Sequence, residues 1–498
     1  AVDMPMEVLL GKPPKMHRDV ARLPVALPPI ETAGFELREV LLDVLRHPTV
    51  ASKAFLVTIG DRSVGGLNCR DPMVGPWQVP VADCAVTLAD FDGYAGEAMA
   101  IGERTPVAVI DAAAASRLAI GEALTNIAAA DVDLAKVKLS ANWMAACGLP
   151  GEDAKLFDAV RAASEFCLGL GISIPVGKDS LSMRTVWRDG DEDKRVAAPV
   201  SRIVAAAAAV DDVRLSLPPQ LRTDCGDTAL ILVDLGQGRQ RLGGSIFAQV
   251  TQQIGNDAPD VDQPAQLAAA IGALRRLAAQ GRVLAYHDRS DGGLFAAVCE
   301  MAFAGHCGVT MNIDVLAIDP VASDWGDFKI RPEQVAVRRD ELTLRALLNE
   351  ELGLLLQVRA DQRSVVMDAL RAAGLGAASH IVGKVQTGSQ ARDTIEIWRD
   401  ARSIFEMPRA DLQRTWSEVS WRIARLRDNP QCADEEFARA TDVDDRGLSI
   451  TLSFDPDEDV AAPMIAAGAR PRIAILREQG VNSHYEMASA FDRAGFTA

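Results

Sequence analysis

The segment "VLAYHDRSDGGLFAAVCEMAFAG", residues 283–305, carries the strongest local signal for secondary structure in the sequence. It opens with an apolar run, continues with the polar cluster "HDRSDGG" at 287–293, and closes with an apolar stretch of helical length. This order is typical of a buried strand that leads through a glycine turn into a helix. The segment therefore predicts a strand–turn–helix unit, with two carboxylates, a guanidinium and a hydroxyl where the strand ends.

The glycines of this cluster indicate a ligand site. Gly292 and Gly293 allow the backbone to approach a ligand closely, and they open a helix whose first N–H groups lack partners and favour an anion. Asp288 and Asp291 would repel that anion unless a hard cation lies between them, and Mg²⁺ accepts carboxylate, hydroxyl and phosphate oxygens. The cluster predicts a metal and phosphate site, and an Asp N-cap with a glycine turn is the structural alternative.

Strands and helices alternate through the second half of the chain. This pattern predicts mixed α and β elements around one sheet. We expect strands at 228–236, 283–287, 309–315, 353–358 and 378–385, and helices at 264–280, 294–305, 343–351 and 362–374.

The first half of the chain also mixes the two kinds of element. We expect helices at 35–47, 115–130 and 156–171, and strands at 53–60, 75–91, 173–187 and 202–210, with a turn at 176–180 and a hairpin tip at 188–195. Together the two halves predict an α+β fold in two lobes.

Composition changes along the chain predict five regions. We expect an extended linker at 1–32, a first lobe at 33–215, a second lobe at 216–400, a polar connector at 401–469 and a βα unit at 470–498. The sequence has no initiator Met, and it ends just after the first helix of the last unit. We therefore expect it to be part of a longer protein.

Composition also limits the function. A chain of 498 residues with 48% hydrophobic and 24% charged residues predicts a globular protein, and its net charge of −17 argues against nucleic-acid binding. We find no apolar run of membrane-spanning length. The eight cysteines form no CxxC pair and mostly lie in apolar surroundings, which predicts free thiols in a cytoplasmic protein. No histidine has metal-ligand spacing, so a zinc site is not indicated.

Other residues could provide oxygen ligands. Asp83 is a lone carboxylate in an apolar strand, so it needs a partner or a cation unless it faces water at the strand end. Glu122 and Asn126 lie four apart on one helix face, which suits Mg²⁺ or Ca²⁺, although a solvated face fits the same spacing. "VGKDS" at 176–180, "GDRSVGG" at 60–66 and Lys53 indicate phosphate contacts, for which ordinary tight turns are the alternative.

Six segments together resemble a known family. They are "SVGGLNCRDPMVGPWQVPVADCAV", "AIGERTPVAVIDAAAASRLAIGEALTNIA", "KLSANWMAACGLPGEDAKLFDAV", "IPVGKDSLSM", "YHDRSDGGL" and "RPRIAILREQGVNSHYEMASAF". In this order they resemble the phosphoribosylformylglycinamidine synthases of purine biosynthesis, in their large single-chain form. These ligases use ATP and glutamine to convert formylglycinamide ribonucleotide into formylglycinamidine ribonucleotide.

The resemblance implies a fold and a set of site residues. It implies an aminoimidazole-ribonucleotide-synthetase-like unit of two α+β lobes, followed by a connector and the first βα unit of a class I glutamine amidotransferase domain. It places the family's magnesium ligands on Asp83, Glu122, Asn126 and Asp288, and its ATP or ADP contacts on Ala82, Ser290 and Lys53. It assigns no catalytic residue in this chain.

The resemblance leaves several roles open. The chain could supply a Mg-nucleotide site to the full amidoligase, where formylglycinamide ribonucleotide, glutamine, a further amino-terminal half and the glutaminase domain are its partners. It could instead be a non-catalytic half in which the nucleotide braces the fold, or a stand-alone relative that uses ATP. The trailing "LREQGVNS" argues against the last role. Because the family's glutaminase cysteine lies beyond this sequence, we expect the chain alone to be inactive in glutamine-dependent synthesis.

Overall fold

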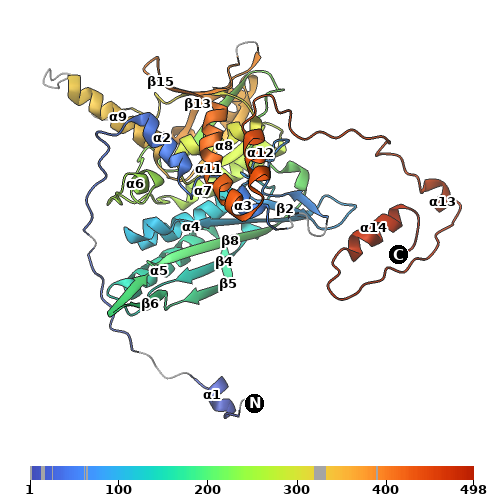
Figure 1. Cartoon of the computed structure of the whole chain (residues 1–498), viewed down its shortest axis with the longest axis horizontal. Helices are drawn as coiled ribbons and strands as arrows, with labels where there is room; N and C mark the ends of the chain where they lie inside the picture. The colour runs from blue at the N-terminus through green and yellow to red at the C-terminus, as the bar shows by residue number, and fades with distance from the viewer. Residues whose placement is uncertain are drawn as a thin grey trace.

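The computed structural model describes residues 3–12, 17–24, 26–60, 62, 66–318, 332–388 and 391–498, with the side chains of 332–337 left aside. Two lobes form the body of the molecule, and the helix α4 (Ala112–Ile127) lies between the sheet of the first lobe and the second lobe (Figure 1).

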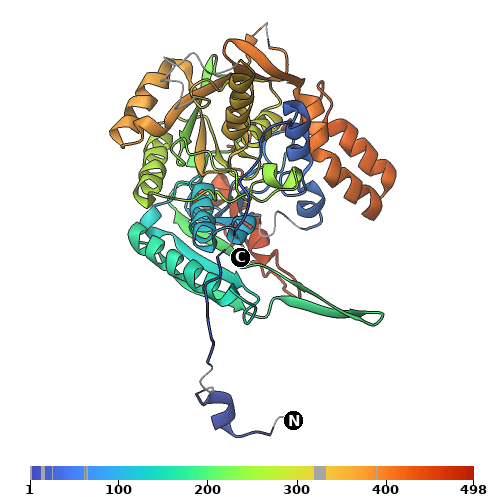
Figure 2. The same cartoon turned by 90° about the vertical axis from the view of Figure 1, so that its left-hand side faces the viewer.

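The first lobe is built on a six-stranded sheet in the order β1-β2-β3-β8-β4-β5. β4 and β5 run parallel, and the other neighbouring pairs are antiparallel. The strands are β1 (Asn68–Arg70), β2 (Ala85–Leu88), β3 (Gly96–Glu103), β4 (Lys138–Met144), β5 (Ser173–Ser180) and β8 (Ser201–Val210). β6 (Arg184–Asp189) and β7 (Glu192–Ala197) form a separate hairpin that projects from the lobe (Figure 2).

The helices of the first lobe cover one face of this sheet. α4 packs on β3 and β8, and α5 (Glu152–Leu170) packs on α4. α4 begins at its N-cap Asp111, whose carboxylate accepts from Ala114 N at 2.9 Å. Its middle is buried on all sides, and a Cβ added at Gly121 would collide with Leu352 of the second lobe. The glycine therefore lets the two lobes approach each other closely.

The second lobe is built on a seven-stranded sheet in the order β10-β12-β9-β13-β11-β14-β15. The pair β11 and β14 is parallel, and the others are antiparallel. The strands are β9 (Thr228–Asp234), β10 (Ala285–Arg289), β11 (Val309–Asn312), β12 (Gly353–Arg359), β13 (Ser379–Val385), β14 (Thr394–Arg399) and β15 (Arg402–Pro408). Its helices are α6 (Ile246–Val250), α7 (Pro264–Ala279), α8 (Gly293–Gly305), α9 (Pro332–Leu348) and α10 (Arg363–Ala372).

The second sheet separates two apolar cores. In β9, Ile231 and Val233 belong to the core shared with α4, α7 and α10, whereas Leu230 and Leu232 belong to the core around α8. The strand is therefore buried on both faces, and this explains why its sequence is a continuous apolar run.

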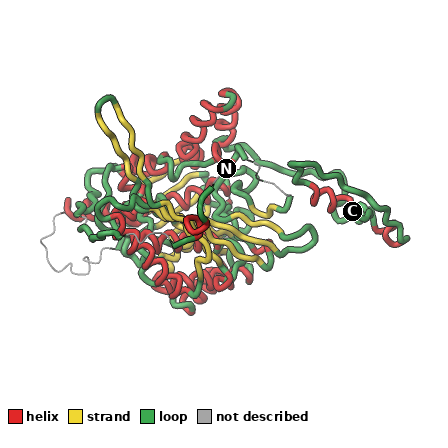
Figure 3. Tube along the Cα trace, turned by 90° about the horizontal axis from the view of Figure 1, so that it is seen from below, coloured by secondary structure: helices red, strands yellow, loops and turns green. Residues whose placement is uncertain are grey.

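Helices from both ends of the chain complete the second core. α11 (Arg409–Arg427) packs on α2 (Leu37–Arg46) and α8, and α12 (Pro430–Ala440) packs on α11. Trp416 of α11 donates its indole N–H to Val50 O at 2.9 Å. The segment after α12 extends to one side of the two lobes and carries α13 (Ala462–Ala466) and α14 (His484–Arg493) (Figure 3). Glu486 of α14 approaches the first lobe at Gly66, where its Cγ would lie 3.3 Å from an added Cβ. α1 (Met6–Leu10) lies at the opposite end of the chain.

Four of the predicted elements are wrong in the structure. Residues 53–60 contain a helical turn, α3 (Ala54–Val57), because Phe55 N bonds to Ser420 Oγ at 2.7 Å and the segment docks on α11. The strand expected at 75–91 is confined to β2, since Val74 and Val79 instead bridge each other across a tight turn. The turn expected at 176–180 lies inside β5, where pairing with β4 keeps it extended.

The fourth difference concerns the strand expected after residue 470. This stretch forms a single bridge, between Arg472 and Thr497, and α14 follows it. A lone strand has no neighbouring strand to satisfy its backbone groups.

None of the helices in the described ranges has both the length and the apolar character that a membrane span requires. All eight cysteines are free thiols, as their sequence context predicts.

Candidate metal and nucleotide site

A cavity of about 600 Å³ lies between the two lobes. Its walls come from the turn before α3, the loop that enters β2, α4, and the end of β10. It is lined by six of the residues proposed from the sequence, Lys53, Ala82, Asp83, Asn126, Asp288 and Ser290. Residues that are far apart in the sequence therefore meet at this cavity.

The strand–turn–helix unit carries the residues that the second lobe contributes to the cavity. β10 pairs with β12, and the chain then turns through Gly292 (φ 81°) and Gly293 (φ 67°) into α8. Ser290 O accepts from Gly293 N at 3.0 Å. A Cβ at Gly293 would lie 2.6 Å from Leu347 O, so packing as well as the positive φ requires glycine there.

A buried polar cluster lies at the centre of the cavity wall. His287 Nδ1 lies 2.6 Å from Asp83 Oδ1, and His287 Nε2 lies 3.0 Å from Glu300 Oε2. Asp83, His287 and Asp288 each offer one ligand atom, and these atoms lie within 4.8 Å of one another. Asp83 Oδ2 is buried and has no hydrogen-bond partner among the described residues. An unpaired carboxylate oxygen beside a second carboxylate fits a hard cation such as Mg²⁺.

The charges of this cluster shift one another's pKa values. Burial raises the pKa of Asp83 even though His287 is adjacent. Burial, together with the neighbouring Asp83, raises the pKa of Asp288 to about 7. Burial opposes the charged form of His287, but Asp83 and Glu300 outweigh it and raise its pKa well above the ordinary value. A protonated His287 is therefore the cation that partly compensates these carboxylates.

The predicted pair on α4 separates in the structure. Asn126 lines the cavity and donates from Nδ2 to Ile101 O at 3.0 Å. Glu122 is buried behind it, where its Oε2 accepts from Glu103 N at 2.7 Å and its Oε1 lies 3.7 Å from the Arg104 guanidinium. Glu122 is thus not solvated, whereas Asn126 is half-buried at the cavity, and a metal-ligand role for Glu122 stays a prediction.

Arg104 also changes the expected role of Asp291. Its guanidinium pairs with Asp291 at 2.5 Å and lies 3.4 Å from Glu350 Oε2. Asp291 is therefore neutralised by an arginine from the first lobe, whereas the sequence pattern suggested a cation between Asp288 and Asp291. Asp288 instead lies beside Asp83 and 3.4 Å from Thr125 Oγ1.

The phosphate-contact candidates have different positions. Lys53 Nζ, at the cavity wall, donates to Thr49 O at 2.9 Å and to Ala51 O, and burial lowers its pKa. Lys178 of "VGKDS" donates to Ser180 Oγ on exposed β5, away from the cavity. Most of the "GDRSVGG" turn, residues 61 and 63–65, lies outside the described residues.

Sequence reasoning missed His287, Glu300 and Arg104. His287 and its partner Asp83 are 204 positions apart, so no spacing motif could join them. Arg104 meets Asp291 across 187 positions. Only the local motif "HDRSDGG" placed His287 near the site.

Comparison with known families identifies three successive regions. Residues 52–209 match the FGAR-AT PurM_N-like domain, where FGAR-AT denotes formylglycinamide ribonucleotide amidotransferase. Residues 227–395 match the C-terminal domain of AIR synthase related proteins. Residues 470–498 match the CobB/CobQ-like glutamine amidotransferase domain.

Solved structures share the fold at low sequence identity. PurL of T. maritima complexed with FGAR matches with a TM-score of 0.51 at 11% identity, over 93% of this chain and 60% of that chain. The same protein complexed with AMPPCP matches with a TM-score of 0.50 at 12% identity, over 92% and 57%. Phosphoribosylformylglycinamidine synthase II from Thermotoga maritima matches with a TM-score of 0.50 at 13% identity, over 76% and 52%. This chain thus spans little more than half the length of those proteins.

These matches confirm the α+β fold with two AIR-synthase-like lobes and a short glutamine amidotransferase segment after them. From the order of these three domains along one sequence, this chain belongs to the formylglycinamide ribonucleotide amidotransferase (phosphoribosylformylglycinamidine synthase) family.

Proposed function

We propose that the chain supplies a Mg-nucleotide site to an ATP- and glutamine-dependent amidoligase that converts formylglycinamide ribonucleotide to formylglycinamidine ribonucleotide in purine biosynthesis. The observation that carries this proposal is the interlobe cavity, which gathers Asp83, Asn126, Asp288 and Ser290 from both lobes of a family member. Similar proteins of known structure bind ATP analogues, as the AMPPCP complex of T. maritima PurL shows for that protein.

The residues of the cavity suit the proposed ligand. Asp83 and Asp288 would hold the metal, with Asn126 as a further oxygen ligand, and Ser290 and the backbone at Ala82 would contact the nucleotide. A bound Mg²⁺ would neutralise the phosphate charge. His287, held between Asp83 and Glu300, fixes the Asp83 carboxylate, and Oδ2 is left without a hydrogen-bond partner among the described residues. Lys53 would have to leave its two carbonyl partners to reach a phosphate.

The proposal includes the partners expected from the family. They are formylglycinamide ribonucleotide, ATP and glutamine in the full-length protein, together with its remaining synthetase half and its glutaminase domain. We infer a cytoplasmic location and no role for nucleic acid or membrane. Because the match to the glutamine amidotransferase domain covers only residues 470–498, we expect no glutaminase activity from this chain by itself.

Analysis of the nucleotide content tests the site. The chain is purified and denatured with acid, the released nucleotide is identified by chromatography, and Mg²⁺ is measured in parallel. We expect about one adenine nucleotide per chain, or a saturable rise in melting temperature when ATP and Mg²⁺ are added to the empty protein. A well-folded chain that neither carries nor binds adenine nucleotide would contradict the proposal.

A second candidate function is that the nucleotide braces the fold without turning over. The observation that favours it is that the cavity joins Asp83 and Asn126 of the first lobe to Asp288 and Ser290 of the second, so that one ligand would bridge both. Asp288→Asn in the full-length protein separates the two functions. A bracing role predicts lower stability with near-normal turnover by the folded fraction, and a catalytic role predicts loss of turnover in a stably folded protein.

A further inference from the structure

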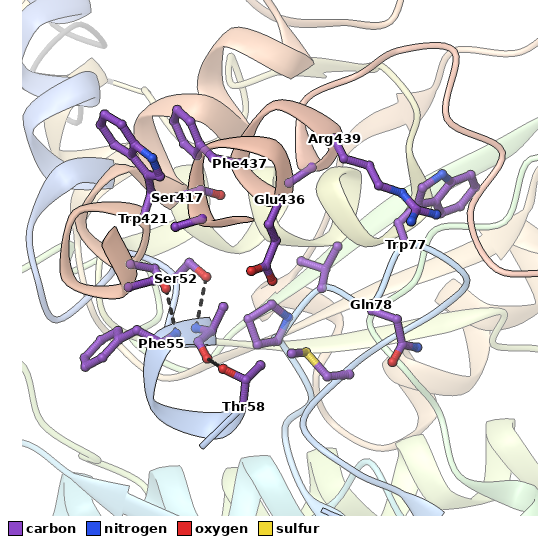
Figure 4. Close-up of a pocket in the computed structure, with 18 of the residues that line it drawn as sticks. Ser52, Phe55, Thr58, Trp77, Gln78, Ser417, Trp421, Glu436, Phe437 and Arg439 are labelled. Atoms are coloured by element: carbon purple, nitrogen blue, oxygen red, sulfur yellow. Dashed lines mark hydrogen bonds between the residues drawn. The ribbon is translucent and has the colours of Figure 1, made fainter. Parts of the chain in front are cut away.

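A second pocket, of about 360 Å³, lies beside the interlobe cavity and has no role in the proposed function. It is enclosed by the α3 turn, the loop at 73–80 and the α11–α12 helix pair, and the two hollows share only Pro80 and Trp416 among their walls. Figure 4 shows Glu436 pointing from α12 into this space, with Trp77 on one side and Trp421 and Phe437 on the other. Its volume is within the range of small-molecule sites.

Aromatic rings form much of the wall, and their polar atoms are already bonded. Trp77 donates its indole N–H to Asp445 O at 2.8 Å, and Trp421 donates to Asp434 Oδ1 at 2.8 Å. Trp421 also stacks on Phe437, with ring centroids 4.7 Å apart. The rings are thus held in place with their donors satisfied. Trp77 lies 4.5 Å from the His306 ring and Arg414 lies 5.6 Å over Phe437, so what the rings leave to a ligand is apolar contact surface.

The charges of the pocket balance except for one. Three arginines contribute to the wall, and each has an aspartate partner: Arg62 with Asp71 at 3.2 Å, Arg427 with Asp428 at 2.6 Å, and Arg439 with Asp445 at 3.3 Å.

Glu436 is the remaining charge. It has no hydrogen-bond or ion-pair partner among the residues that the structure describes. Its carboxylate is exposed to the pocket, so a ligand could reach it directly.

We propose that this pocket binds a small organic cation, an ammonium group carried on an apolar or aromatic body. The ammonium bonds to the Glu436 carboxylate, and the apolar body packs against Trp77, Trp421 and Phe437. An anion is disfavoured because every arginine of the wall already has a carboxylate partner, whereas the free charge is negative. This site does not depend on the Mg-nucleotide site.

Benzylammonium is the probe for the test, with benzyl alcohol as its neutral counterpart and benzoate as its anionic counterpart. Binding is followed by tryptophan fluorescence, because Trp77 and Trp421 line the pocket. We expect saturable binding of benzylammonium, and affinity lower by about tenfold for benzyl alcohol, the factor that one charge-assisted contact supplies.

Two variants locate the site. Glu436→Gln keeps the shape and removes the charge, and we expect it to weaken benzylammonium binding by about tenfold. Glu435→Gln is the matched control, because Glu435 is exposed on the same helix, bonds to Gln431 and does not line the pocket, so binding stays unchanged. Absence of saturable binding, equal affinity in Glu436→Gln, or preference for benzoate would each overturn the proposal.

Discussion

Asp83 shows most clearly how a single residue relates to the proposed function. One of its oxygens bonds to His287, and the other is buried with no partner in the described part of the chain. A buried carboxylate oxygen left unpaired is costly, so the folded chain gains from any cation that reaches it. The sequence indicated that Asp83 needs a partner or a cation. It could not show that a histidine would bond to only one of the two carboxylate oxygens.

Replacement of Asp83 by asparagine tests whether a bound cation stabilises the folded chain at this residue. We expect Asp83→Asn to remain folded, because its amide oxygen can still accept from His287, and to lose the stabilisation by Mg²⁺ and ATP. At ligand concentrations about a hundredfold above Kd, the wild-type chain gains about 2.7 kcal/mol in the free energy of unfolding. Differential scanning calorimetry with and without Mg-ATP measures this stabilisation in the wild type and in the variant. The exposed Asp19→Asn is the control, and it should be stabilised like the wild type. Equal stabilisation of both variants would argue against a ligand at Asp83.

Glu350 provides a test that depends on pH. It is 3% exposed and accepts from Gly292 N and Ile246 N, both at 2.8 Å. Burial, together with Asp291, raises its pKa to about 8. The folded state therefore favours the protonated carboxyl, and this contribution to stability is complete below about pH 4.3, the ordinary pKa of glutamate, and is lost as pH rises through 8.

Glu350→Gln makes that group permanently neutral while its oxygen still accepts both N–H groups. We expect the stability of the variant relative to wild type to increase from pH 5 to pH 8, by at most about 1.4 kcal/mol per pH unit. Urea unfolding at several pH values measures this difference, and exposed Glu435→Gln gives the baseline. A difference that does not change with pH would show that Glu350 is ionised throughout.

At the scale of elements, the turn between β10 and α8 determines where the site forms. Gly293 has φ 67°, and a side chain there would meet the carbonyls of Leu347 and Asn349. Gly281 has a similar φ of 65° but open space around it. Comparing the two glycines separates the cost of backbone conformation from the cost of the collision.

We expect Gly281→Ala to lower the free energy of unfolding by about 1–2 kcal/mol, the cost of a left-handed conformation for a residue with a Cβ. For Gly293→Ala we expect the same loss in the free energy of unfolding and about 1–3 kcal/mol more, because the added methyl group would overpack against fixed backbone. Denaturant unfolding monitored by circular dichroism compares the variants. Equal losses would mean that α8 shifts to accommodate the added methyl group.

Elements with strong local patterns could be predicted from the sequence. The 283–305 unit and the helices near 115–130 and 156–171 formed where periodicity placed them. The segment 53–60 has a strand-like composition, but its conformation is set by Ser420, more than 360 positions away. Tertiary contacts of this kind outweigh local propensity, and a single sequence does not reveal them.

For the candidate site, the residue types could be predicted, but only the fold shows which of them meet. Asn126 and Asp288 reach one cavity, whereas Glu122 turns to Arg104.

At the scale of the whole molecule, the first sheet has one face that its helices do not cover. The row Ile101, Ala205, Ser140 and Val176 crosses four strands in register. Ile101, which also lines the interlobe cavity, is 61% exposed, and Val176 is 62% exposed, so this face offers apolar surface to another protein from the rim of the cavity outward. We expect the purified chain to associate reversibly through this face.

Replacement of both residues by threonine tests this expectation, because threonine keeps the strand preference and adds a polar group. The wild-type chain should show an apparent mass above 53.2 kDa that rises with concentration in light scattering, and Ile101→Thr with Val176→Thr should remain near that mass. Leu168→Gln, at a 78% exposed position on α5, is the control and should associate like wild type. Association that survives the double variant would assign it to another surface.

Binding of a metal and a nucleotide between the lobes, at Asp83 and Asp288, can be observed in a crystal grown with ADP and Mn²⁺. Anomalous scattering locates the metal without assumptions about its ligands. We expect an anomalous peak within about 2.5 Å of Asp83 Oδ2 and of an Asp288 carboxylate oxygen, with the nucleotide beside Ser290. Metal and nucleotide bound elsewhere, or a cavity that stays empty at saturating ligand, would contradict it.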